Sequence, residues 1–81
     1  MGEISLEEKI KIAISETMGN DVDVDVTGSE SKYTVKVVTD DFIGKSIIQR
    51  HKMIYASLNK YIQTGEIHAL TIESLTNDES K

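Results

Sequence analysis

Cysteine is absent from the 81 residues of this chain. Its absence excludes a disulfide scaffold, a cysteine zinc site and a thiol nucleophile. A chain of this length makes one domain whose core is large enough to fold alone but has little stability to spare. We therefore predict a single domain over residues 1–81, with a core at about 5–75 and a frayed tail at 76–81.

Long apolar runs are also missing, because no stretch approaches the roughly 18 residues that a membrane span needs. The opening M-G-E-I-S-L-E-E is acidic and lacks the apolar region of a secretory signal. Leu6 stands where a myristoylation signal requires Ser or Thr. We expect a cytoplasmic protein that has no membrane partner.

Acidic residues are absent from residues 42–65, although the net charge of the chain is −5. The positive charges of this segment are Lys45, Arg50, Lys52 and Lys60. Such a surface suits an anionic partner, whether nucleic acid, an acidic protein patch or a carboxylate-rich small molecule. A solvated helix that happens to be basic would produce the same pattern.

Local patterns predict a helix followed by a hairpin. Ser5 and Glu8 form a capping box, and Gly19 with Asn20 ends the helix. Its apolar face is expected to hold Leu6, Ile10, Ala13, Ile14 and Thr17. Residues 21–26, D-V-D-V-D-V, alternate as a half-buried strand does, with valines inward and aspartates in water. A turn at 27–32 and a returning strand at 33–38 complete the hairpin.

A second helix, from about residue 49 to 63, and a third strand at 65–72 follow. The helix is expected to present Ile54, Tyr55, Leu58, Tyr61 and Ile62 to the core. Alternation along the strand places His68, Leu70 and Ile72 on one face, and Ile67, Ala69 and Thr71 on the other. The histidine therefore sits at the rim of an apolar face.

The element order α-β-β-α-β predicts an α+β fold. A helical crossover favours a parallel pair between the second and third strands, and the hairpin is antiparallel. The result is a three-stranded mixed sheet, order 1-2-3, with both helices on one face. This is the order of a type II KH domain, whose RNA-clamping loop reads G-x-x-G. The corresponding Gly44-Lys45-Ser46-Ile47 lacks the second glycine and gives RNA binding only weak support.

Calcium binding and hydrolysis are not predicted. A calcium loop starting at Asp21 would need glycine at its sixth position and glutamate at its twelfth, where Val26 and Lys32 stand. No G-x-S-x-G elbow or glycine-rich oxyanion loop accompanies the serines and histidines. We expect a binding protein and not an enzyme.

Two short motifs resemble the BolA family. The run 42–58, F-I-G-K-S-I-I-Q-R-H-K-M-I-Y-A-S-L, is followed by I-H-A-L at 67–70. In that family a Phe-x-Gly element precedes an Arg-His-Arg-x-Val-Tyr signature, and His-Ala-Leu opens the last strand. The first signature here is R-H-K-M-I-Y at 50–55, with two conservative departures, and the second is unchanged. The turn G-S-E-S at 28–31 is also similar, and the resemblance covers roughly residues 6–75.

The resemblance implies a partner of monothiol glutaredoxins. Such a pair can hold a bridging [2Fe-2S] cluster, to which the glutaredoxin contributes a cysteine and bound glutathione another thiolate. The histidine of His-Ala-Leu, here His68, is the ligand from the BolA side. The implied role is cluster trafficking or iron homeostasis, with no cofactor in the isolated protein, which is expected to be a monomer or weak homodimer.

The family's second ligand is a cysteine or histidine in the loop between the first two strands, and residues 27–32 contain neither. His51 is the other imidazole of the chain, as a second ligand or as a capping group at the helix start. The alternative function is transcription regulation through DNA, because some BolA-like proteins are described as regulators. Either partner, DNA or glutaredoxin, is expected to bind Gly44, Lys45, Arg50, Lys52 and Lys60.

Overall fold

Serine caps determine where both helices begin. The computed structural model describes residues 4–19, 21–30 and 32–81. Helix α1 (Leu6–Met18) starts after Ser5, whose hydroxyl accepts a hydrogen bond from the Glu8 N–H at 3.3 Å. Helix α2 (Ile47–Gln63) starts after Ser46, where a complete capping box with Gln49 sets the boundary two residues before the predicted one.

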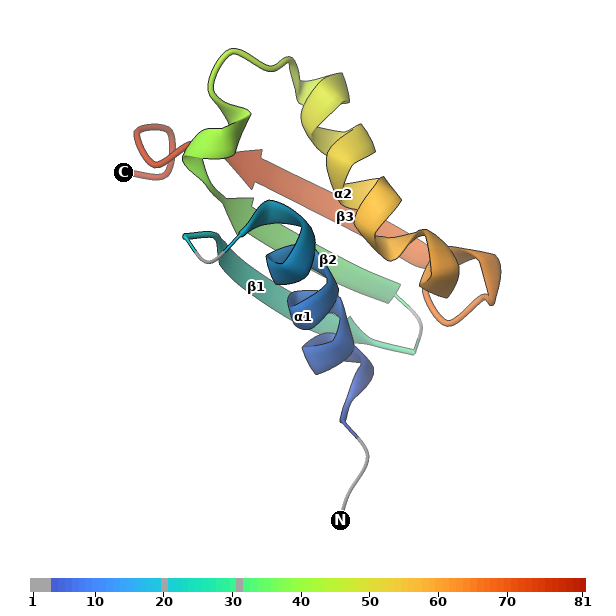
Figure 1. Cartoon of the computed structure of the whole chain (residues 1–81). Coiled ribbons are helices and arrows are strands. Elements are labelled where there is room, and N and C mark those ends of the chain that lie inside the picture. The colour runs from blue at the N-terminus through green and yellow to red at the C-terminus, as the bar shows by residue number, and fades with distance from the viewer. Residues whose placement is uncertain (1–3, 20, 31) are drawn as a thin grey trace.

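Three strands form one mixed sheet in the order β1-β2-β3 (Figure 1). Strand β1 (Asp23–Ser29) is antiparallel to β2 (Lys32–Val38), and β2 is parallel to β3 (Ala69–Leu75). A short 3₁₀ helix, η1 (Asp40–Phe42), leads from β2 toward α2, and α2 makes the right-handed crossover to β3. The predicted α+β, KH-like order with helices on one face is confirmed.

The hairpin turn is shorter than predicted. Both strands extend into the segment 27–32, and the ladder pairs Gly28 with Tyr33. Gly28 has φ +138°, and a Cβ at this position would collide with the carbonyl oxygen of Lys32, so only glycine fits. Residues 1–3 of the predicted domain, Asn20 at the predicted helix end and Ser31 in the predicted turn lie outside the described residues.

The core lies between the sheet and the two helices. Its buried members are Ile10, Ile14, Met18, Val26, Val35, Val37, Phe42, Ile54, Leu58 and Ile67. Two helix positions differ from the prediction: Met18 is buried in place of the exposed Thr17, and Tyr55 is 43% exposed. No helix in the described part of the chain combines the length and apolar character of a membrane span.

The strand alternation breaks just before β3. Ile67 is buried and His68 is exposed, the reverse of the predicted pattern. The reason is that both residues precede the strand, and the Ile67 N–H donates to the Tyr61 carbonyl oxygen at 3.1 Å, which turns the Ile67 side chain under the end of α2.

The tail, predicted to fray, is folded. Residues 77–80 form a turn, Thr76 is buried, and Glu79 accepts hydrogen bonds from Arg50 at 2.7 Å and from the Thr76 N–H at 2.8 Å. The buried guanidinium of Arg50 holds this turn against the body of the domain, because a buried charge needs a partner.

Candidate functional site

The β1–β2 turn and the loop from α2 to β3 meet at one end of the sheet. The parallel register pairs Lys32 with Ala69, so the residue before β3 lies beside the turn that precedes β2. That residue is His68, and its side chain is exposed. The fold therefore presents one imidazole at this end of the sheet, where a second molecule can reach it.

Backbone contacts fix the approach to His68. The bond from Ile67 to Tyr61 anchors the preceding residue to the end of α2. Earlier in the loop, Gly65 adopts φ +82°, and the Thr64 hydroxyl donates to the Glu66 carboxylate at 3.1 Å. The histidine thus combines a positioned backbone with an accessible ring, as a ligand offered to another molecule requires.

This end of the sheet supplies few further metal ligands. Glu30, with φ 55°, is the acidic residue of the turn, and segment 27–32 has no cysteine or histidine. Over residues 4–19, 21–30 and 32–81, no three His, Cys, Asp or Glu side chains gather in a group that could hold a metal ion. A metal or cluster at His68 would therefore need ligands from a second molecule.

The two histidines are not brought together. His51 is half-buried near the start of α2, whereas the Ile67–Tyr61 bond places His68 near its end. Ten residues of helix separate His51 from Tyr61, a distance of about 15 Å along the axis. His51 does not cap the helix either, because Ser46 and Gln49 form the cap.

Three of the four predicted basic residues are exposed. Lys45, Lys52 and Lys60 are spread along α2 and the loop before it. The Lys45 ammonium donates to the Asp41 carbonyl oxygen at 3.0 Å, and the Lys60 ammonium lies 5.0 Å from the centroid of the Tyr61 ring. Gly44 has φ +80° and open space around it. These residues form an elongated surface and not one compact cluster.

Arg50 differs from the other basic residues, because its side chain is only 8% exposed. Its guanidinium donates to the carbonyl oxygens of Lys45 at 3.1 Å and Ser74 at 3.2 Å. It also pairs with Glu79 and lies 5.6 Å from the centroid of the Phe42 ring. These contacts occupy the guanidinium within the domain, so Arg50 is not available for the partner binding that the sequence predicted.

Glu79 was missed by the sequence reasoning, since no local pattern joins it to a residue 29 positions earlier. The hydrogen bond from the Arg50 guanidinium holds the pKa of the Glu79 carboxyl below its usual value, and the Thr76 N–H contributes in the same direction. The carboxylate therefore stays ionised and paired at neutral pH.

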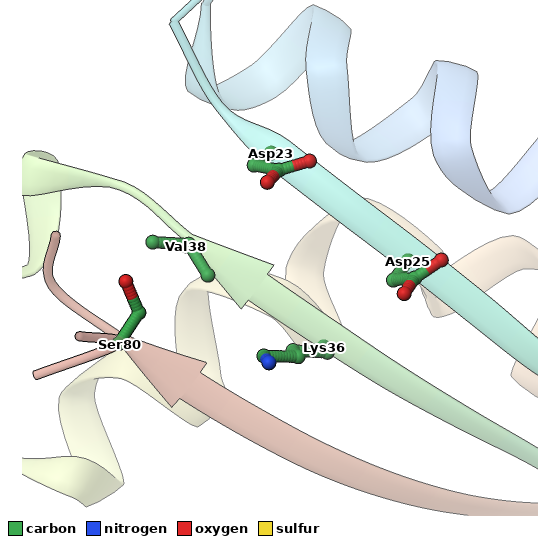
Figure 2. A pocket seen from close by; sticks show the side chains of 5 residues that line it. All are labelled: Asp23, Asp25, Lys36, Val38 and Ser80. Atoms are coloured by element: carbon green, nitrogen blue, oxygen red, sulfur yellow. The ribbon is translucent and has the colours of Figure 1, made fainter.

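The sheet face opposite the helices carries a shallow hollow lined by charged residues of both signs (Figure 2). Its lining consists of Asp23, Asp25, Lys36, Val38 and Ser80. The aspartates are exposed, as their alternation predicts, and Ser80 of the C-terminal turn closes one end of the hollow.

The fold and the site together define an α+β domain of KH-like order that presents one exposed histidine at one end of its sheet. A family model described as BolA-like protein matches residues 7–79. The chain therefore belongs to the BolA family.

Individual comparisons agree with this assignment. The chain is 41% identical over 59 residues to an uncharacterised protein of Acinetobacter guillouiae, covering 73% of this chain and 71% of that protein. It is 34% identical over 76 residues to the DNA-binding transcriptional regulator BolA of Escherichia coli, covering 88% and 71%. The structure of BolA1 from Arabidopsis thaliana shares the fold, with a TM-score of 0.85, 23% identity and coverage of 98% and 100%.

Proposed function

We propose that this protein pairs with a monothiol glutaredoxin in the cytoplasm and holds a [2Fe-2S] cluster between the two proteins, in cluster trafficking or iron regulation. The observation that carries the proposal is the exposed His68, which stands on a fixed backbone beside the β1–β2 turn. His68 opens the sequence His-Ala-Leu, the motif of the family ligand.

Imidazole suits this role, because histidine replaces thiolate on one iron of Rieske clusters and raises the cluster potential. The glutaredoxin cysteine and glutathione would supply thiolates. This chain contributes His68 alone at that end of the sheet, since His51 lies about 15 Å away along α2 and the segment 27–32 has no cysteine or histidine. The donor set thus fits the family pattern in part, and we expect a cluster that is lost faster than one with two BolA ligands.

Co-expression with a monothiol glutaredoxin tests the proposal. We expect the purified pair to show visible absorption and circular dichroism from a bound cluster. His68→Ala should abolish the mixed complex or change its spectrum. His51→Ala is the matched control, because it removes the other imidazole of the chain, and it should leave the spectrum unchanged. An unchanged spectrum in a folded His68→Ala pair would contradict the ligand role.

DNA binding is a second candidate, favoured by the acid-free segment and by the relative named as a DNA-binding regulator. Lys45, Lys52 and Lys60 are its exposed cations. If these three lysines contact phosphates, a plot of the logarithm of the binding constant against the logarithm of the salt concentration should have a slope of roughly −2.7. A labelled duplex titrated at several salt concentrations measures this slope. No binding at low salt would remove this candidate and leave the glutaredoxin proposal untouched.

A further inference from the structure

Three hydrogen-bond donors converge just beyond the C-terminal end of β3. The Arg50 guanidinium donates through Nη1 at 2.7 Å and through Nη2 at 3.4 Å to the two carboxylate oxygens of Glu79. The backbone N–H of Thr76 donates to the first of these oxygens at 2.8 Å. We call these donors the Arg50 fork: the two Nη atoms of Arg50 and the Thr76 N–H. A guanidinium that reaches both oxygens of one carboxylate is among the strongest ways to bind that group.

The body of the domain holds the Arg50 fork in place without Glu79. Nε of Arg50 donates to the Lys45 carbonyl oxygen at 3.1 Å, and Nη1 also donates to the Ser74 carbonyl oxygen at 3.2 Å. The guanidinium lies 5.6 Å from the centroid of the buried Phe42 ring, and the Arg50 side chain is only 8% exposed. Removal of Glu79 would therefore leave the donors aimed at the same point, which is the preorganisation that a binding site requires.

The turn that delivers Glu79 is polar and exposed. Residues 77–81 read N-D-E-S-K, and all five are exposed. The turn projects past the end of β3, outside the layers of sheet and helices (Figure 1). Besides the Arg50 fork, a hydrogen bond from the Asn77 N–H to the Asp40 carboxylate at 3.1 Å ties it to the domain. Segments with little apolar burial open locally at low free energy, so Glu79 can leave the fork while the sheet and helices stay folded.

We propose that the Arg50 fork is a binding site for a carboxylate of a partner protein, and that Glu79 fills this site from within until the partner's carboxylate displaces it. The seated group identifies the chemistry of the ligand, because the three donors already bind a carboxylate. The Glu79 side chain is 45% exposed although Arg50 is buried, so the fork opens to solvent on the side that Glu79 occupies. A second molecule can approach from that side.

The surroundings of the fork favour an acidic protein segment that also carries an apolar side chain. Residues 42–65 contain no acidic residue, so this part of the chain does not repel a carboxylate. Helical side chains lean toward the N-terminus, and the bond from Nε to the Lys45 carbonyl oxygen places the Arg50 guanidinium beside Ile47, three residues earlier on α2. Ile47 is 55% exposed and Ile48 69%, and exposed aliphatic side chains suit a peptide better than a sugar-phosphate backbone.

The tether of Glu79 determines which ligands can displace it. Because Glu79 belongs to the same chain as the fork, its effective concentration there is on the order of millimolar or higher. A small free carboxylate therefore competes poorly, whereas a partner segment that also covers Ile47 competes better. The proposal does not rest on the cluster function, because the fork lies beyond the C-terminal end of β3 and His68 precedes the N-terminal end.

Glu79→Ala tests the site by emptying it. Acetate should bind this variant saturably, with a shift of the Thr76 amide resonance in NMR spectra, and should raise its melting temperature above that in sodium chloride of equal ionic strength. If Glu79→Ala is unfolded without acetate, acetate should restore its folding.

The unmodified protein should bind acetate about tenfold more weakly, because Glu79 occupies the fork. Asp78→Ala is the matched control, since it removes the neighbouring carboxylate, whose side chain is 96% exposed, and it should behave as the unmodified protein does. Failure of acetate to bind or refold Glu79→Ala, or equal affinities in the three proteins, would overturn the proposal.

N-acetyl-leucine, a carboxylate with an aliphatic side chain, tests the kind of ligand. It should bind Glu79→Ala about threefold more tightly than acetate, because it covers apolar surface beside the fork. Adding Ile47→Ser should remove this difference, whereas Ile12→Ser, at a 43% exposed position of α1, should preserve it. Equal affinities of the two carboxylates would overturn the assignment to an apolar protein segment. Tighter binding of inorganic phosphate than of N-acetyl-leucine would instead assign the fork to the phosphate groups of nucleic acid.

Discussion

Ser74 buries its hydroxyl without a hydrogen-bond partner, on the inner face of β3. Its carbonyl oxygen accepts a hydrogen bond from the Arg50 guanidinium, whereas the side-chain hydroxyl has no partner. A buried polar group without a partner costs roughly 1 to 3 kcal/mol. The Ser74 side chain therefore weakens the domain at a position where an apolar group of similar size would fit.

We expect Ser74→Ala to raise the free energy of unfolding by about 1 kcal/mol, because it removes the unsatisfied hydroxyl and leaves only a small void. Urea denaturation measures the change. Ser57→Ala is the control, since the Ser57 hydroxyl donates to the Met53 carbonyl oxygen at 3.2 Å and its removal should bring no gain. A loss of stability in Ser74→Ala would mean that the hydroxyl has a partner.

The Arg50–Glu79 pair makes the free energy of unfolding depend on pH. The pKa of Glu79 is lowered from its ordinary value of 4.5, so its contribution to stability is present above that value. The contribution is lost as pH falls through the folded-state pKa, where the carboxylate becomes protonated.

Glu79→Gln should therefore lower the urea midpoint at pH 7, because it leaves the Arg50 guanidinium buried without its counter-charge. The difference from the unmodified protein should shrink as the pH is lowered below 4.5. Asp78→Asn serves as the control, since the neighbouring Asp78 side chain is 96% exposed. A difference that is constant with pH would rule out the ion pair as its cause.

Among the elements, the hairpin depends most on one residue. Gly28 combines a positive φ with a close approach of the Lys32 backbone, and the ladder continues on both sides of it. This contact lets β1 and β2 pair up to the turn, beside the position of His68.

Gly28→Ala should destabilise the domain by about 2 kcal/mol or more, through backbone strain together with the collision with Lys32. Gly44→Ala is the comparison, because Gly44 also has a positive φ but open space around it, and strain alone should cost about 1 kcal/mol. Thermal unfolding of the two variants checks the order. Equal losses of stability in the two variants would show that the strands shift to accommodate a Cβ atom at Gly28 without a further free-energy cost.

Local signals were sufficient for most elements, since the Ser5 cap marks α1 and alternation marks β1 and β2. The Ser46 cap of α2 was not predicted, and that helix begins two residues before the predicted start. They were insufficient wherever a distant contact decides the outcome. The tail folds because Glu79 meets Arg50, and neither residue carries a sign of the other in its own neighbourhood. Tyr55 stands at a helical spacing that suits the core, but its side chain is 43% exposed because the neighbouring Ile54 and Leu58 take the buried side of α2.

At the scale of the whole molecule, this chain contributes one side chain, His68, to the candidate site. The position of His68 follows from the family motif, but the short turn beside it became visible only with the register of β2 and β3. This chain thus presents one positioned imidazole at this end of the sheet, and in the proposed complex the partner would supply the remaining ligands.

Adding a second imidazole at the turn should strengthen the proposed complex. Glu30 is a described turn residue, and Glu30→His would supply the loop ligand that the resemblance to the family implies and this chain lacks. We expect the mixed complex with a monothiol glutaredoxin to lose its visible absorption more slowly on exposure to a chelator. Glu30→Gln, which adds no imidazole, is the control. Equal rates of loss would contradict a ligand position in the turn.

The parallel pairing of β2 with β3 also bears on the stage of folding at which the site forms. Lys32 and Ala69 are partners in the ladder although 37 positions separate them in the chain, whereas the hairpin closes between near neighbours. Local hairpins form within microseconds, but a contact across a long loop must first overcome the entropy of closure. We expect His68 to reach the turn only in that late step, so a partly folded chain would lack the arrangement that the proposed cluster complex requires.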